Sequence, residues 1–290
     1  VVYAGSVSSN GVPIDMDPTD GVDAVTMLDA FAEDIFLTRL SPGIAESPDY
    51  EWSRVYGSVD SVFTDAGLGE RAMAVAVDSQ TGDIAIAGMT IAPIFANNVL
   101  NFECLQTQPI VSGSIPQLLI VKMDASGDCL WARDLAAGYS TFVLDVAIDI
   151  EHDILITGYF GETVDFDPGE GTTARTACAA HDMFVAKYDG DTGDLLWVHV
   201  SCAERQGEDT FGRAVATDSA GSVYVTGSFK DAHHSGGTDF NPQPVCGGTP
   251  GDRHNVVSNI GYDIFLMKLS GDGCYQWTKT MGGPGDDHAV

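Results

Sequence analysis

The fold is decided by residues 182–229, which read DMFVAKYDGDTGDLLWVHVSCAERQGEDTFGRAVATDSAGSVYVTGSF. Four short segments of this stretch alternate apolar and polar residues, and Gly, Asp and Ser fill the gaps between them. β-Branched and aromatic residues at period two, bounded by turn residues, predict four strands at 183–188, 195–197, 214–218 and 223–227. We expect these strands to form one four-stranded antiparallel sheet.

The four predicted strands recur along the chain. Trp52, Trp131, Trp197 and Trp277 each follow a cluster of turn residues. The last strand recurs as VVYAG, IAIAG, ILITG and VYVTG, and the first strand recurs as DIFL, QLLI, DMFV and DIFL. One sheet cannot bury both of its faces, so a unit that repeats every roughly 65 to 80 residues predicts sheets stacked on one another.

The predicted fold is all-β: a β-propeller built from four-stranded antiparallel blades, with a β-solenoid or a sandwich array as the alternatives. The phase of the repeat gives a partial blade at 1–33, blades at 34–116, 117–181 and 182–262, and a partial blade at 263–290. Both ends fall inside a repeat, and we therefore expect the chain to be a fragment of a larger ring.

The order of the motifs also resembles a known family. D-x-F-x-x-K, a turn, L-x-W, G-x-D-D, A-V-x-x-D and V-Y-V-T-G together are similar to the bacterial SBBP repeat, in a variant with a D-F-D-P-G insertion. Gln117 departs from the pattern, since the other copies begin with Asp. The resemblance implies a propeller and no particular activity. WD40 and kelch repeats compete with it, but the chain has no Gly-His to Trp-Asp pairing and no consistent Gly-Gly doublet.

Each copy of the insertion carries two oxygen-bearing side chains one residue apart, which lie on the same face of an extended segment. The four pairs are Asp15 and Asp17, Asn101 and Glu103, Asp165 and Asp167, and Asp239 and Asn241. Carboxylate and amide oxygens are the ligands that calcium prefers, so these pairs predict calcium sites, with Asp20 or Glu170 available to complete a shell. The alternative is a surface hairpin whose acids cap turns and whose Phe or Met packs on the blade.

Six cysteines fall into three neighbouring pairs, and each pair joins the loop after an insertion to the region around the next Trp. Sequence alone allows fifteen connectivities. The repeat register favours three disulfides: Cys104 with Cys129, Cys178 with Cys202, and Cys246 with Cys274. Such bridges imply an oxidising, extracytoplasmic compartment. Free thiols and zinc are the alternatives, but no Cys-x-x-Cys or Cys/His pair has the spacing of zinc ligands.

The formal net charge of −29 limits the partners. An acidic surface repels nucleic acid and anionic membranes, and it favours cations or basic partners. The uncharged run at 84–102 is interrupted by Gly88 and Pro93, which predicts a strand and a loop and no membrane insertion.

No catalytic motif of a known type occurs in the sequence. Two turns carry paired acids, Glu208 with Asp209 and Asp286 with Asp287, which could serve as the acid and base of a glycosidase. Their recurrence favours a turn role, and the His233-His234 pair is expected to be solvated. The predicted protein is a non-catalytic, secreted or cell-surface propeller that acts as a structural or binding scaffold. Its blade loops would contact protein, glycan or a like subunit. The alternative is a carbohydrate-active propeller enzyme, either a hydrolase or a lyase.

Overall fold

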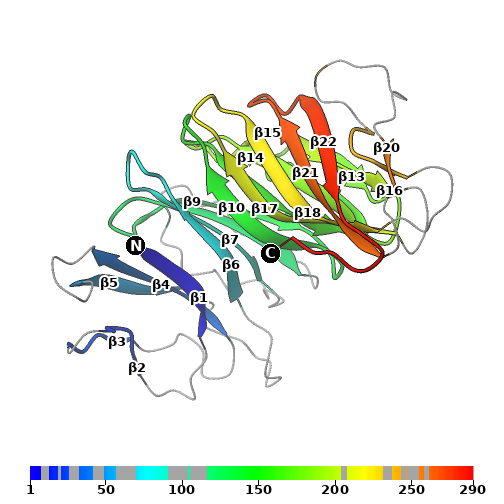
Figure 1. Ribbon diagram of the computed structural model, residues 1–290. Coiled ribbons are helices and arrows are strands. Elements are labelled where there is room, and N and C mark those ends of the chain that lie inside the picture. Colours follow the sequence, from blue (N-terminus) through cyan, green and yellow to red (C-terminus); the bar gives the residue numbers. More distant parts are fainter. Residues whose placement is uncertain are drawn as a thin grey trace. The chain divides into compact units, whose positions relative to one another are not determined.

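The computed structural model describes residues 1–7, 13–18, 21–25, 33–41, 49–56, 70–90, 104, 116–203, 208–230, 237–242, 246, 255–257 and 261–289. These residues build strands and turns only, and they form two compact units, Val1–Ala136 and Ala137–Val290 (Figure 1). Across these ranges there is no helix with the length and hydropathy needed to span a bilayer. The predicted all-β class is confirmed.

The first unit contains one three-stranded and one four-stranded antiparallel sheet. The three-stranded sheet has the order β1-β4-β5, with β1 at Val2–Val7, β4 at Asp34–Ser41 and β5 at Asp49–Tyr56. The four-stranded sheet has the order β6-β7-β8-β9, with strands at Glu70–Val77, Ile84–Thr90, Gln117–Met123 and Cys129–Ala136. A small hairpin pairs β2 (Ile14–Asp15) with β3 (Ala24–Val25).

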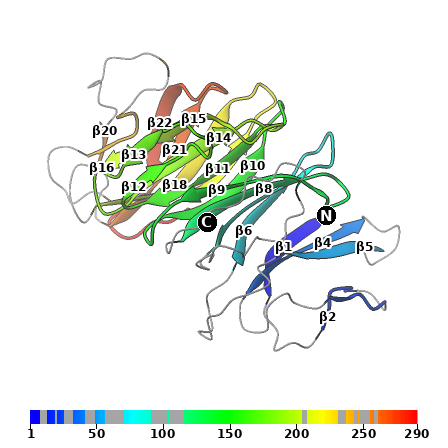
Figure 2. The ribbon, with the colours of Figure 1, turned by 180° about the vertical axis from the view of Figure 1, so that it is seen from behind.

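The second unit contains two four-stranded antiparallel sheets (Figures 1 and 2). One has the order β10-β11-β14-β15, with strands at Phe142–Ile148, Ile154–Phe160, Asp182–Tyr188 and Leu195–Val200. The other has the order β17-β18-β21-β22, with strands at Asp209–Thr217, Val223–Lys230, Tyr262–Leu269 and Tyr275–Met281. The insertions form a hairpin of β12 (Thr163–Asp165) with β13 (Ala174–Thr176), and a small sheet of β16 (Cys202–Ala203), β19 (Thr238–Asp239) and β20 (Asn255–Val256).

The four strands predicted in 182–229 all form, but the prediction that they make one sheet is wrong. β14 and β15 pair back onto β11, whereas β17 and β18 pair forward onto β21. Closeness in sequence misleads here. β18 and β21 are hydrogen-bonded neighbours although a long insertion separates them in sequence, whereas β15 and β17 are close in sequence but lie in different sheets. Each repeat therefore contributes two strands to each of two sheets, and all three complete sheets follow this rule.

The glycine inside each V-T-G-like strand has a steric cause. Gly88, Gly158 and Gly227 lie opposite a bulge in the preceding strand, where the register shifts. A Cβ atom on Gly227 would lie 1.8 Å from the carbonyl oxygen of Phe211, and one on Gly158 would lie 1.9 Å from that of Phe142. Only glycine fits such a close backbone approach, which explains why the repeat retains it.

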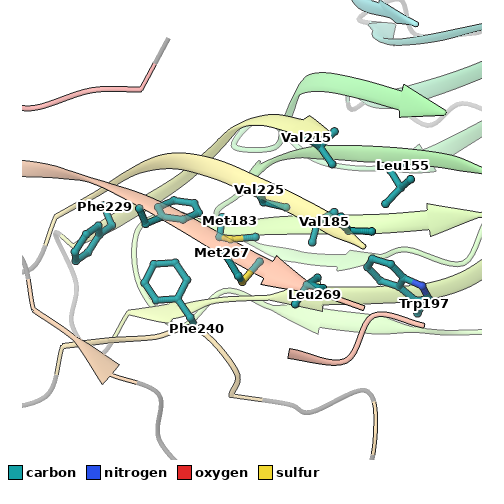
Figure 3. Close-up of a cluster of buried hydrophobic side chains, with 12 residues drawn as sticks. Leu155, Met183, Val185, Trp197, Val215, Val225, Phe229, Phe240, Met267 and Leu269 are labelled. Atoms are coloured by element: carbon teal, nitrogen blue, oxygen red, sulfur yellow. The ribbon is translucent and has the colours of Figure 1, made fainter. Parts of the chain in front are cut away.

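Neighbouring sheets pack face to face within each unit. In the second unit, Val185 and Trp197 of one sheet meet Val225 and Met267 of the other in a buried cluster. Figure 3 shows this cluster, with Trp197 at one end and the aromatic rings of Phe229 and Phe240 at the other. The buried apolar area between sheets is the main stabilising contribution to such a stack.

The tryptophan of one sheet rests on a glycine turn of the next. The Nε1 atom of Trp197 donates a hydrogen bond of 2.9 Å to the carbonyl oxygen of Gly271, and its ring lies against Gly273, whose φ of +77° favours glycine. The first unit repeats the contact, since the ring of Trp52 lies against Gly127, with a φ of +83°. The recurring Trp and the recurring turn glycine thus pack against each other in both units.

Candidate functional site

The hairpin acids predicted to bind calcium accept hydrogen bonds from their own turns. Oδ1 of Asp165 accepts from the amides of Asp167 and Thr173, at 3.2 and 2.7 Å, and Oδ1 of Asp167 accepts from Gly169. Asp15 repeats this arrangement with the amides of Asp17 and Asp23, at 3.1 and 3.0 Å. These are the local turn contacts that Asp side chains commonly make.

The third described hairpin repeats the pattern, because Oδ1 of Asp239 accepts from the amide of Asn241 at 2.9 Å. The apolar residue between the two polar ones is fully buried at Phe166 and Phe240. Asn101 and Glu103 lie outside the described residues. The contacts match the turn-capping alternative, and calcium binding by these hairpins stays a prediction.

A different acidic group brings three carboxylates together. Oxygens of Asp149, Glu151 and Asp153 lie within 4.8 Å of one another, the one such group of three in the part of the chain that the structure describes. The group can hold a cation, and the ammonium of Lys187 already lies among these oxygens, at 2.8 Å from Asp149 and 3.0 Å from each of the others. Burial alone would lower the pKa of Lys187, but the hydrogen bonds to the three carboxylates outweigh it and raise that pKa.

The three disulfides join the cysteine pairs expected from the repeat register. Cys104 bonds to Cys129, Cys178 to Cys202, and Cys246 to Cys274, with Cα atoms 4.7 to 5.2 Å apart. None of the six cysteines is a free thiol. Each bridge fastens an inter-strand loop to a neighbouring segment, as the prediction required.

The first-strand aspartate is a buried structural carboxylate. Asp182 accepts hydrogen bonds from the amides of Cys178 and Ala203, at 2.6 and 2.8 Å, and so holds both ends of the Cys178–Cys202 loop. Burial raises the pKa of Asp182, although these hydrogen bonds oppose the rise. The D-x-F motif therefore serves the fold.

The paired acids at the start of the third repeated strand also make fixed contacts. Asp209 accepts from the Tyr262 hydroxyl at 2.8 Å, and it lies 2.8 Å from Nδ1 of His181. Asp286 accepts from the amide of Tyr262 at 3.0 Å, and Asp287 accepts from that of Gly283 at 2.8 Å. Burial, with the Asp209 hydrogen bond, raises the pKa of Tyr262 to about 12. Asp209, Asp286 and Asp287 thus take part in contacts that position neighbouring groups.

Around Asp209, six aromatic side chains form a continuous series that we call the aromatic row. Its contacts run from Phe142 to Tyr159 (5.2 Å between centroids), from Tyr159 to Phe211 (4.8 Å), and onward to Tyr262 (6.0 Å). His181 packs edge-on against Tyr159 at 5.2 Å, and His288 packs on Tyr262 at 5.2 Å. Five of these side chains are half-buried and His288 is exposed. The row crosses from the first to the second sheet of its unit.

The first unit carries different chemistry at the equivalent positions. Glu33 precedes the buried Asp34 as His181 precedes Asp182, and Arg71 pairs with Met89 as Phe211 pairs with Ser228. Glu33 and Arg71 form an ion pair there. The fold thus accepts either an ion pair or stacked rings, so the aromatic character of the row is not a requirement of the repeat.

Sequence reasoning found Asp209 and missed His181 and Tyr262. These two residues directly precede a first-strand Asp, a position that also holds Glu33 and Pro116. The available signal was a position that varies in all four copies beside a neighbour that is Asp in three of them. His233 and His234 lie outside the described residues.

Comparison with known proteins agrees with this architecture. No family model matches the chain. An uncharacterized WD repeat-containing protein of Acanthamoeba polyphaga mimivirus is 25% identical over 202 residues, which make up 68% of this chain and 13% of that protein. The chain therefore spans a small part of the length of this relative.

The distant WD repeat relative and the four-stranded antiparallel sheets together define the class: a β-propeller-type repeat protein. At this level the prediction from the repeat is confirmed. The finer resemblance to the SBBP family has no match among the comparisons and stays a prediction.

Proposed function

We propose that this protein is a non-catalytic, secreted or cell-surface β-propeller scaffold that binds its partners through exposed surfaces of its sheets and loops. The observation that carries the proposal is that three of the paired acids already have hydrogen-bond partners. Asp209 contacts His181 and Tyr262, and Asp286 and Asp287 accept backbone hydrogen bonds. These contacts favour positioning over acid–base chemistry.

The chemistry of His181 also supports a binding role. Asp209 lies at Nδ1, and among the described residues no hydrogen bond reaches Nε2. A hydrolase of the Ser-His-Asp type needs a nucleophile hydrogen-bonded to that second nitrogen. The described surroundings offer a half-exposed aromatic surface in its place.

The three disulfides support the proposed location. Bridges of this kind persist in oxidising compartments and are rare in the cytosol. Alkylation of free thiols in freshly isolated native protein, followed by mass spectrometry of non-reduced peptides, tests this part. Recovery of the three bridged peptides is expected, and alkylated cysteines in place of the bridges would contradict an extracytoplasmic location.

The enzyme alternative is tested by prolonged incubation of the oxidised protein with neutral oligosaccharides and acidic polysaccharides, followed by chromatography of the products. We expect no cleavage. Cleavage that the Asp209→Asn variant loses would overturn the proposal and favour the carbohydrate-active enzyme. Asp165→Asn, which alters a turn carboxylate of the β12–β13 hairpin, is the matched control.

A further inference from the structure

The aromatic row offers two kinds of contact at once. The half-buried rings of Phe211 and Tyr262 have partly open surfaces, and their centroids are 6.0 Å apart. Aromatic faces carry negative charge density and attract the weakly positive hydrogens of C–H groups. A ligand that lies along the row therefore needs apolar C–H faces.

Hydrogen-bonding groups lie among the same rings. Asp209 is the acceptor for the Tyr262 hydroxyl, and a carboxylate can only accept, so Nδ1 of His181 carries the hydrogen of the 2.8 Å contact. In the tautomer with this single ring hydrogen, Nε2 of His181 presents a lone pair toward an incoming donor. The Tyr262 oxygen also keeps lone pairs for a second hydrogen bond. A ligand for this surface thus needs hydroxyl groups as well as C–H faces.

Charges of both signs surround the row. The guanidinium of Arg213 lies 5.7 Å from the centre of the Phe211 ring, and the ammonium of Lys230 lies 5.4 Å from that of Tyr262. Asp209, Asp286 and Asp287 supply negative charges beside the same residues. Because cations and anions lie side by side here, the surroundings favour an uncharged ligand over an anionic or strongly basic one.

From these observations we propose that the aromatic row is a binding site for a neutral pyranose saccharide. The sugar stacks its C–H face on Phe211 and Tyr262, and one of its hydroxyl groups donates to Nε2 of His181. Asp209 is a positioning residue, because it fixes the orientation of His181 and Tyr262. The inference rests on the proposed binding function and names the class of ligand.

The test uses isothermal titration calorimetry of the intact, oxidised chain with cellohexaose, mannohexaose and chitohexaose, each at up to millimolar concentration. Binding of at least one of them is expected. Phe211→Ala should weaken that binding about tenfold, in line with the contribution of one aromatic contact. His181→Gln should weaken it to a similar degree, because Gln keeps an amide donor for Asp209 and loses the Nε2 atom that accepts from the sugar hydroxyl.

Tyr224→Ala is the matched control. Tyr224 is a half-exposed ring in β18 of the same sheet and is not part of the row. Circular dichroism and the melting temperature show whether each variant folds, and His181→Gln, with the smaller change in volume, keeps the test valid should Phe211→Ala unfold.

Three outcomes overturn the inference: no binding of any of the three sugars, unchanged binding in both row variants, or an equal loss in Tyr224→Ala. Binding of a protein partner that the row variants abolish, without sugar binding, also overturns it. Cleavage of a bound sugar would instead contradict the non-catalytic scaffold and leave the saccharide site standing, so the two proposals fail in distinguishable ways.

Discussion

Lys187 offers the sharpest test of how this fold is held together. Its side chain is 3% exposed, and its ammonium is the counter-charge for Asp149 and Asp153, whose side chains are 1% and 12% exposed. In Lys187→Met a side chain of similar length would leave these carboxylates buried without their cation. The third partner, Glu151, is 69% exposed and contributes little, because water screens exposed pairs.

Removing one partner of a buried ion pair typically costs ~3–5 kcal/mol, because the remaining charge stays buried. For a cooperative unit of this size each kcal/mol lowers the melting temperature by about 2–4 °C, which predicts a decrease of roughly 6–20 °C. Thermal unfolding of the oxidised protein, followed by circular dichroism at neutral pH, measures it.

Lys268→Met is the matched control, because Lys268 occupies the same position of the repeat in β21. Its ammonium lies over the Tyr224 ring at 4.9 Å, and we expect a melting temperature close to that of the unmodified protein. If the two variants melt at the same temperature, the reasoning about buried charge is refuted. Calcium should raise the melting temperature of Lys187→Met more than that of the unmodified protein, since a divalent ion can replace the lost ammonium among these three carboxylates.

Three further predictions concern the repeat. Asp165→Ala should lower the free energy of unfolding by about 1–2 kcal/mol through two lost hydrogen bonds; a decrease seen only in the presence of calcium would favour the metal site instead. Gly227→Ala should strongly destabilise the protein in denaturant titrations, whereas Gly285→Ala, with no atom within 4 Å of the added Cβ, should not; equal stabilities would contradict the steric argument. Because burial raises the pKa of Asp182, the folded state binds this proton more tightly than the unfolded state, so its contribution to stability is greatest below the ordinary carboxyl pKa and falls as the pH rises through the raised one. Unfolding of Asp182→Asn across that pH range should lack this fall, and an identical pH dependence would refute it.

The strands could be predicted from the sequence, but their pairing could not. The alternation around Trp197 and in Val223–Gly227 placed the strands, since each strand has one face against the neighbouring sheet. β18 and β21 are hydrogen-bonded partners separated by a long insertion, and hydrophobic periodicity says nothing about partners. The cysteine pairs could be predicted because the repeat register supplied the distance information that periodicity lacks.

The candidate site was less accessible to prediction. Lys187 belongs to a repeated motif, but its acidic partners lie about 36 residues earlier, in the turn between β10 and β11. His181 and Tyr262 meet at Asp209 only because β14 and β21 lie in different sheets of one unit. Contacts between sheets depend on packing, for which one sequence carries no local signal.

The way each repeat is divided between two sheets has a consequence for synthesis on the ribosome. The hairpin of β17 and β18 leaves the exit tunnel well before β21 and β22, which complete the same sheet. Trp197 likewise cannot form its hydrogen bond until Gly271, 74 residues later in the chain, has been synthesised. During synthesis, the sheet that follows the last complete one therefore has only its first two strands until the next insertion has been translated. A pause in translation within an insertion would leave open strand edges exposed to chaperones or to other nascent chains.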